Sequence, residues 1–204
     1  MTLRCAHRFR GIGRVAAALS GAGLCVSCGH SAPTEYLTLR PVPPAAGVVP
    51  AVADPVRVVA VRVPPWLDRL EVARPTPGAA VVVEDFERWS APLGELATAA
   101  LTEDLAARLV GVSVLPVRAA APAATRDVSV DLSSLTRDGA MLELHGTVTV
   151  TDARTGALIL SLPVHLRAPA AADARGEASA LDQLMGELAD VLAPALRTAT
   201  AASR

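Results

Sequence analysis

The chain has 204 residues and a formal net charge of −1 at pH 7, a length typical of one domain. The near-neutral charge gives no basic field for binding nucleic acid, and 2% aromatic residues leave little to stack on bases. All three cysteines, Cys5, Cys25 and Cys28, lie in the first 28 residues. The rest of the chain therefore has no disulfide, no thiol nucleophile and no cysteine-based metal site.

The first 27 residues have the organisation of an export signal. Arginines between Arg4 and Arg14 precede Val15–Ser27, in which every residue is apolar or small. These 13 residues span about 20 Å as a helix, too short for the ~30 Å hydrocarbon core of a membrane. Segment 1–27 is therefore predicted to be a signal peptide, and the residues at its end indicate the lipoprotein type.

The leader ends in Leu24-Cys25-Val26-Ser27-Cys28, which resembles the lipobox of bacterial lipoproteins. The resemblance implies that Cys28 is acylated after the leader is cut off before it. Cys25 is the poorer candidate, because the bulky Leu24 stands directly before it. A redox or zinc role for Cys25 and Cys28 as a C-x-x-C pair would require the leader to be retained.

Residues 28–54 are rich in Pro, Ala, Gly and Val and are predicted to be a linker, with a first short strand at Tyr36–Leu39. A folded domain is expected over 55–198. It opens with Val56–Val63, a β-branched run that predicts a buried central strand. Two more short strands are predicted, at 70–73 and 79–83.

A helix is predicted after Ser90, which can cap it, with Pro92 in the first turn. Its apolar residues recur at helical spacing, and Gly111 ends it. The stripe consists of Leu93, Leu96, Ala97, Ala100, Leu101, Leu105 and Leu109. A strand at 112–117 follows. From Arg126 onward apolar and polar residues alternate, with turns at Asp138-Gly139 and Asp152–Gly156, which predicts a three-stranded antiparallel meander.

A second apolar stripe predicts the closing helix: Leu181, Leu184, Met185, Leu188, Val191, Leu192 and Ala195. Pro194 is expected to kink or end this helix, because its ring clashes with the carbonyl four residues back. Residues 199–204 are predicted to be a frayed tail. The predicted fold class is α+β, an antiparallel-rich sheet with two amphipathic helices packed on one face.

The sequence offers few candidates for chemistry. Centring the last hairpin near Arg154 places His145 opposite Pro163 and His165 opposite Glu143, so that Glu143 and the two histidines could form a metal-binding group. An ordinary polar sheet surface is the favoured interpretation. The carboxylate clusters Asp127/Asp131 and Glu84/Asp85/Glu87 have arginine neighbours, Arg126 and Arg88, that indicate surface ion pairs. No catalytic motif is present, so we predict a protein that is not an enzyme and has no cofactor.

Trp66, Phe86 and Trp89 hold nearly all the aromatic content. The favoured interpretation is that they fill the core where the first helix meets the sheet. The alternative is that Pro64-Pro65-Trp66-Leu67 is an exposed apolar loop, with Trp66 and Leu67 contacting a partner.

Three segments resemble the paraquat-inducible lipoprotein C family, also called ABC-type transport auxiliary lipoproteins. They are Val63-Pro64-Pro65-Trp66-Leu67-Asp68-Arg69, Val72-Ala73-Arg74, and Phe86-Glu87-Arg88-Trp89-Ser90-Ala91-Pro92-Leu93. The resemblance implies an outer-membrane-anchored periplasmic protein and partner of a mammalian-cell-entry (MCE) domain protein, in a system that moves lipid between membranes. Gly29 follows Cys28 where the inner-membrane retention signal would have Asp. The family has no catalytic residues to transfer.

Two other functions stay open. One is a lipoprotein activator or assembly factor of cell-wall or secretion machinery, which would also be an anchored α+β domain. The other is a secreted metal-dependent enzyme that uses His145 and His165. A homo-oligomer is compatible with the preferred transport function.

Overall fold

Strands divide between two sheets in the computed structural model, which describes residues 33–45, 54–75 and 80–202. The predicted leader and Cys28 lie outside these residues. The elements are β1 (Glu35–Leu37), β2 (Val56–Arg62), β3 (Glu71–Pro75), β4 (Val81–Trp89), α1 (Leu93–Arg108), β5 (Val114–Leu115), β6 (Arg126–Asp138), β7 (Met141–Asp152), β8 (Leu158–Pro169) and α2 (Ala174–Ala202). The compact unit described below begins at Thr34.

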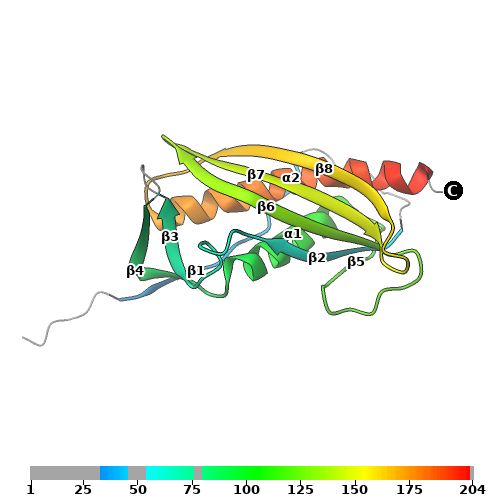
Figure 1. The fold of residues 1–204 in the computed structure, drawn as a ribbon, viewed down its shortest axis with the longest axis horizontal. Coiled ribbons are helices and arrows are strands. Elements are labelled where there is room, and N and C mark those ends of the chain that lie inside the picture. Colours follow the sequence, from blue (N-terminus) through cyan, green and yellow to red (C-terminus); the bar gives the residue numbers. More distant parts are fainter. Residues whose placement is uncertain (1–32, 46–53, 76–79, 203–204) are drawn as a thin grey trace, which may run out of the picture. The chain divides into compact units, whose positions relative to one another are not determined.

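The larger sheet has the strand order β5-β2-β6-β7-β8, and the smaller has the order β1-β4-β3 (Figure 1). The antiparallel meander of β6, β7 and β8 is confirmed. β2 runs parallel to both β5 and β6, and β1 runs parallel to β4. The α+β class is therefore confirmed, with two mixed sheets in place of the single sheet expected.

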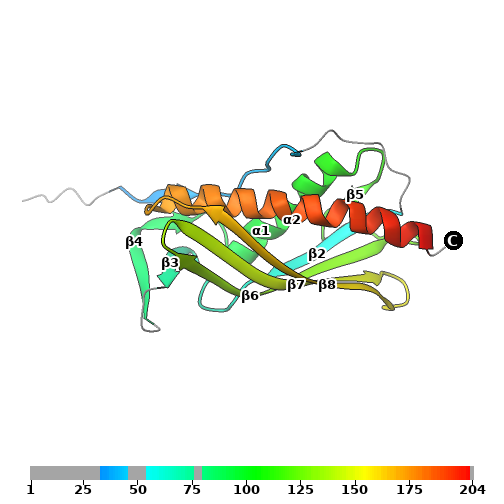
Figure 2. The ribbon, with the colours of Figure 1, turned by 90° about the horizontal axis from the view of Figure 1, so that it is seen from above.

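Both helices cover the same face of the five-stranded sheet (Figure 2). α1 packs on β2, α2 packs on β8 and β7, and the two helices contact each other. The alternation in β6 places Val128 and Val130 fully inside, beneath the helices. Burial of each such side chain stabilises the fold by about 1.5–3 kcal/mol. The other face of this sheet, which we call the open face, carries the polar members of the alternation.

Helix α1 is buried along the predicted stripe, but Ser90 does not cap it. Its N-cap residue is Pro92, which makes no side-chain capping bond. The backbone N–H of Gly94 instead donates to Asp68 Oδ1 at 3.1 Å. A side chain from the loop after β2 thus supplies the acceptor that Ser90 was expected to offer. Gly94 is needed here, because a Cβ would lie 2.9 Å from the Val61 carbonyl oxygen.

Helix α2 begins where Asp173 Oδ1 accepts a hydrogen bond from the Gly176 N–H at 2.7 Å. Pro194 was expected to kink or end the helix, and it does not end it, because the helix continues to Ala202, past residue 199, where the tail was expected. Leu192 and Leu196 are buried on either side of the proline, and this packing compensates for the missing hydrogen bond. Val191, predicted on the apolar stripe, is 40% exposed.

Candidate interaction surface

The predicted lipid anchor, Cys28, and the alternative Cys25 lie outside the described residues. In the described part of the chain, no helix combines the length and apolar character needed to span a membrane.

The loop after β2 contains the predicted partner contacts. The N–H groups of Leu67 and Asp68 both donate to the Pro64 carbonyl, at 2.8 and 3.2 Å, which turns the chain sharply. The turn buries Leu67, which is 3% exposed, so Leu67 is not available to a partner. Trp66 is half-buried and packs on the core, with part of its surface accessible.

The expectation that all three aromatic residues fill the core holds fully only for Trp89. Its side chain is 2% exposed and belongs to the hydrophobic core at the end of β4, where Trp89 pairs with Leu37 of β1. Phe86, in the same strand, is 47% exposed. The smaller sheet therefore presents an apolar ring on its surface.

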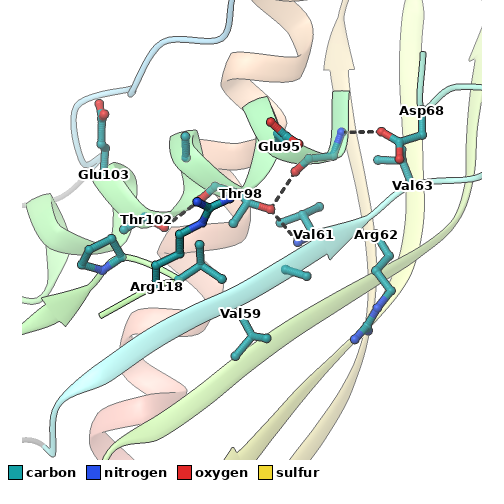
Figure 3. Close-up of a pocket in the computed structure, with 15 residues that line it drawn as sticks. Val59, Val61, Arg62, Val63, Asp68, Glu95, Thr98, Thr102, Glu103 and Arg118 are labelled. Carbon is teal, nitrogen blue, oxygen red and sulfur yellow. Dashed lines mark hydrogen bonds between the residues drawn. The ribbon is translucent and has the colours of Figure 1, made fainter. Parts of the chain in front are cut away.

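A pocket of about 880 Å³ lies beside the Trp66 loop, between β2, α1 and the segment after β5 (Figure 3). Val63 and Asp68, which flank the loop, both line the pocket. Thr98 Oγ1 accepts from the Val61 N–H at 2.8 Å and donates to the Gly94 carbonyl at 2.7 Å. This hydroxyl satisfies the Val61 amide, which lies beyond Arg57, the last residue of β2 that pairs with β5. Sequence reasoning missed the pocket, because a threonine on the polar side of a helix is typical of a solvated surface.

Residues 38–44, which we call the strap, run along α1 and α2. The Arg40 N–H donates to Asp182 Oδ1 at 2.8 Å, and the Val42 N–H donates to Asp104 Oδ1 at 2.7 Å. Arg108 Nη1 donates back to the Val42 carbonyl at 3.0 Å. Part of the predicted linker 28–54 is therefore bound to the folded unit, because aspartates on both helices accept its backbone N–H groups.

Gly186 of α2 allows the strap to approach this closely. A Cβ at this position would lie 3.0 Å from the Val42 Cβ and 3.4 Å from Arg108 Nη2. The missing side chain thus leaves room for both Val42 and the guanidinium beneath it.

Charged residues behind the strap form a second set of contacts, which we call the clamp: Asp104, Arg108 and Asp190. Arg108 Nε donates to Asp190 Oδ1 at 2.6 Å, and Arg108 Nη1 lies 3.3 Å from Asp104 Oδ1. Asp104 is fully buried and Arg108 is 4% exposed. Burial raises the pKa of Asp104, whose Oδ2 has no hydrogen-bond partner among the described residues.

Glu177, near the start of α2, forms another buried ionic group. Arg74 Nε of the smaller sheet lies 3.2 Å from Glu177 Oε2, and Arg137 Nη2 of the larger sheet lies 3.6 Å from the same oxygen. Burial raises the pKa of Glu177. The group joins both sheets to one helix, which is a structural role.

His145 and His165 lie directly opposite each other on β7 and β8, and Glu143 faces Arg167. The predicted register is therefore wrong by two residues. The turn closes on the pair Asp152 and Ala157, and a shift between Val150 and Thr151 adds one more residue to β8. Glu143 and both histidines are nevertheless close together on the open face.

The carboxylates of β6 are paired with arginines of β2. Asp127 Oδ2 lies 2.6 Å from Arg57 Nη2, and Asp131 Oδ1 lies 2.9 Å from Arg62 Nη1. The expected ion pairing is confirmed, with partners other than Arg126. Sequence reasoning did not find these partners, because the parallel pairing of β2 with β6 was not predicted. Carboxylates held in this way are poorly suited to general acid–base catalysis.

The comparison with protein families now decides the class of this protein. The sequence model of the ABC-type transport auxiliary lipoprotein component matches residues 37–193, which run from the end of β1 into the last turns of α2. The chain belongs to this family. Its members are auxiliary components of ABC-type transport, and the family is one of lipoproteins. The resemblance seen in the three segments between Val63 and Leu93 is thereby confirmed.

Solved structures share the fold of this auxiliary lipoprotein. An uncharacterized protein is 19% identical with a TM-score of 0.64, covering 80% of this chain and 98% of its own. A Xanthomonas campestris protein of family DUF330 is 15% identical with a TM-score of 0.62, covering 81% of this chain and 95% of its own. No curated protein matches the auxiliary lipoprotein.

Proposed function

We propose that this protein is a non-enzymatic periplasmic lipoprotein, anchored in the outer membrane through acylated Cys28, and an auxiliary component of an ABC/MCE-type system that moves lipid between membranes. The observation that carries the proposal is the family match over residues 37–193. It includes the whole strap, α1, most of α2 and all of the strands from β2 to β8, so the resemblance extends well beyond the Trp66 loop.

Because the strap is bound to the folded unit, an anchor at Cys28 would limit the distance between the domain and the membrane. Only residues 29–33 separate Cys28 from the compact unit, which begins at Thr34. A chain of this length reaches at most about 20 Å when fully extended. An acyl group on Cys28 therefore keeps the domain close to the membrane, whereas a free linker of residues 28–54 would have let it stand far off.

The contacts of four aspartates support the proposal that this protein is not an enzyme. Asp127 and Asp131 are paired with Arg57 and Arg62, and Asp104 and Asp182 hold the strap.

For the partner we propose an MCE-domain protein, which contacts the accessible surface of Trp66 and the adjoining pocket. Self-association into a homo-oligomer is part of the same proposal.

Metabolic labelling with a radioactive fatty acid tests the anchor. We expect label in the wild-type protein and in Cys25→Ser, and its loss in Cys28→Ser, since acylation requires the Cys28 thiol. Label that persists in Cys28→Ser and disappears in Cys25→Ser would move the anchor to Cys25.

Crosslinking in cells, followed by identification of what is captured, tests the transport function. We expect an MCE-domain protein. Consistent recovery of cell-wall synthases or secretion components would favour the activator or assembly function.

A further inference from the structure

Two imidazole rings lie face to face on the open face of the larger sheet. His145 of β7 and His165 of β8 are direct cross-strand partners, with ring centroids 4.0 Å apart and planes inclined by 15°. Their side chains are 42% and 53% exposed. The pair belongs neither to the pocket nor to the strap, and the transport function proposed above gives it no role.

Glu143 adds a carboxylate to the pair. Its Oε2 lies 3.9 Å from Nε2 of His145 and 3.9 Å from Nε2 of His165. These separations are too long for hydrogen bonds. Arg167 Nε lies 2.7 Å from the other oxygen, Oε1, and so orients the carboxylate while leaving Oε2 directed at both rings.

The spacing of these atoms fits a metal ion after a small adjustment. One ligand atom from each of the three residues lies within 4.8 Å of the others. In a tetrahedral zinc site with bonds of about 2.1 Å, ligand atoms are roughly 3.4 Å apart. Exposed imidazoles can close the remaining gap, at most about 1.4 Å, by rotating about χ1 and χ2, without a change in the strands.

We propose that Glu143, His145 and His165 form a binding site for a divalent transition-metal ion of the zinc type. Two imidazoles and a carboxylate are ligands that zinc accepts, whereas calcium and magnesium prefer oxygen alone. Three protein ligands leave one tetrahedral position open to water or to a donor group from a partner. The ion also offsets the negative charge of Glu143. Arg167 neutralises this charge only in part, because its guanidinium also pairs with Asp138, whose Oδ2 lies 3.4 Å from Arg167 Nη2.

Zn²⁺ titration of the purified full-length chain by calorimetry tests the site. The comparison protein is His145→Ala/His165→Ala, in which every other potential ligand, including the three cysteines, is unchanged. We expect the wild type to bind one more equivalent of Zn²⁺ than this double variant. Glu143→Gln should retain the equivalent with weaker affinity, because an amide oxygen is a poorer zinc ligand than a carboxylate.

Thr149→Ala/Ser161→Ala is the matched control, since these residues are also direct partners on β7 and β8. It should bind as many equivalents as the wild type, and circular dichroism checks that all variants fold. Equal stoichiometry in the wild type and the histidine double variant would overturn the site. Unchanged affinity in Glu143→Gln would remove Glu143 from it and contradict the three-ligand arrangement.

Discussion

Two groups of arginine–aspartate pairs differ in where they lie: one joins β2 to β6 on the open face, and the other, the clamp, lies on α1 and reaches Asp190 of α2. On the open face, Arg62 Nη1 and Asp131 Oδ1 are 2.9 Å apart, with side chains 58% and 53% exposed. In the clamp, Arg108 and Asp104 are 3.3 Å apart, with side chains 3% and 0% exposed. The exposed pair is therefore closer than the fully buried one.

Burial therefore decides the energetic role of these pairs more than distance does. Water and salt screen the exposed pair, so its net contribution is small. Within the clamp the charges of Asp104 and Arg108 are shielded from water, and they are tolerated because Arg108 also bonds the partly exposed Asp190 and the Val42 carbonyl. Desolvation raises the pKa of Asp104 despite that arginine. The clamp holds the strap in position at a cost that the open-face pair does not have.

Arg108→Ala should have the largest effect, a loss of about 3–5 kcal/mol in the free energy of unfolding, because it leaves a buried Asp104 without its cation. Arg62→Ala is the matched control and should cost less than about 1 kcal/mol. Urea unfolding followed by circular dichroism measures both. Equal losses in the two variants would contradict the distinction between buried and exposed pairs.

Asp104→Asn should change how stability depends on pH. The pKa of Asp104 in the folded protein is raised above its ordinary value of 3.8, so between these two values the folded state binds more protons than the unfolded state. The stability of the wild type relative to Asp104→Asn should therefore fall as the pH rises through that interval. Unfolding curves of both proteins at several pH values measure the difference. Glu177 cancels in this difference, since both proteins contain it, whereas the Asp104 charge also helps to raise the pKa of Asp182 and so adds a contribution of the same sign. A relative stability that rises with pH would show that the sign is wrong.

The smallest effect should be the coupling between Arg62 and Asp131. A double-mutant cycle with Arg62→Ala and Asp131→Ala should give about 0.2–1 kcal/mol at low salt, and less at 0.5 M salt, because both groups are exposed. A coupling that exceeds this range and does not respond to salt would place the pair in the same class as the clamp.

The parts of the fold that follow from local periodicity could be predicted. The stripe containing Leu101 and Leu105 predicts α1, and the alternation around Val128 and Val148 predicts the meander, because each pattern reports which face of one element is buried. One signal for the clamp was present and not used. Asp104 and Arg108 fall at helical spacing from Ala100, within the apolar stripe, which indicates a charge pair inside the fold.

The rest depends on contacts between distant segments. Alternation does not say which strands are neighbours, so the parallel pairing of β2 with β6, and with it the partner of Asp127, stayed hidden. The strap is proline-rich and looks like a linker until Asp104 and Asp182 are placed beside it. A single shift near Val150 was enough to change which residue faces His145.

Site-specific photo-crosslinking in cells tests the central claim, that this lipoprotein serves an MCE-type transport complex, most directly. A photoreactive amino acid would replace Trp66, which is half-buried beside the pocket, or Val191, which is 40% exposed on α2, as the control. We predict that an MCE-domain protein is captured at position 66 and not at position 191. Capture at position 66 of a cell-wall or secretion component, with no MCE-domain protein at either position, would contradict the proposed function.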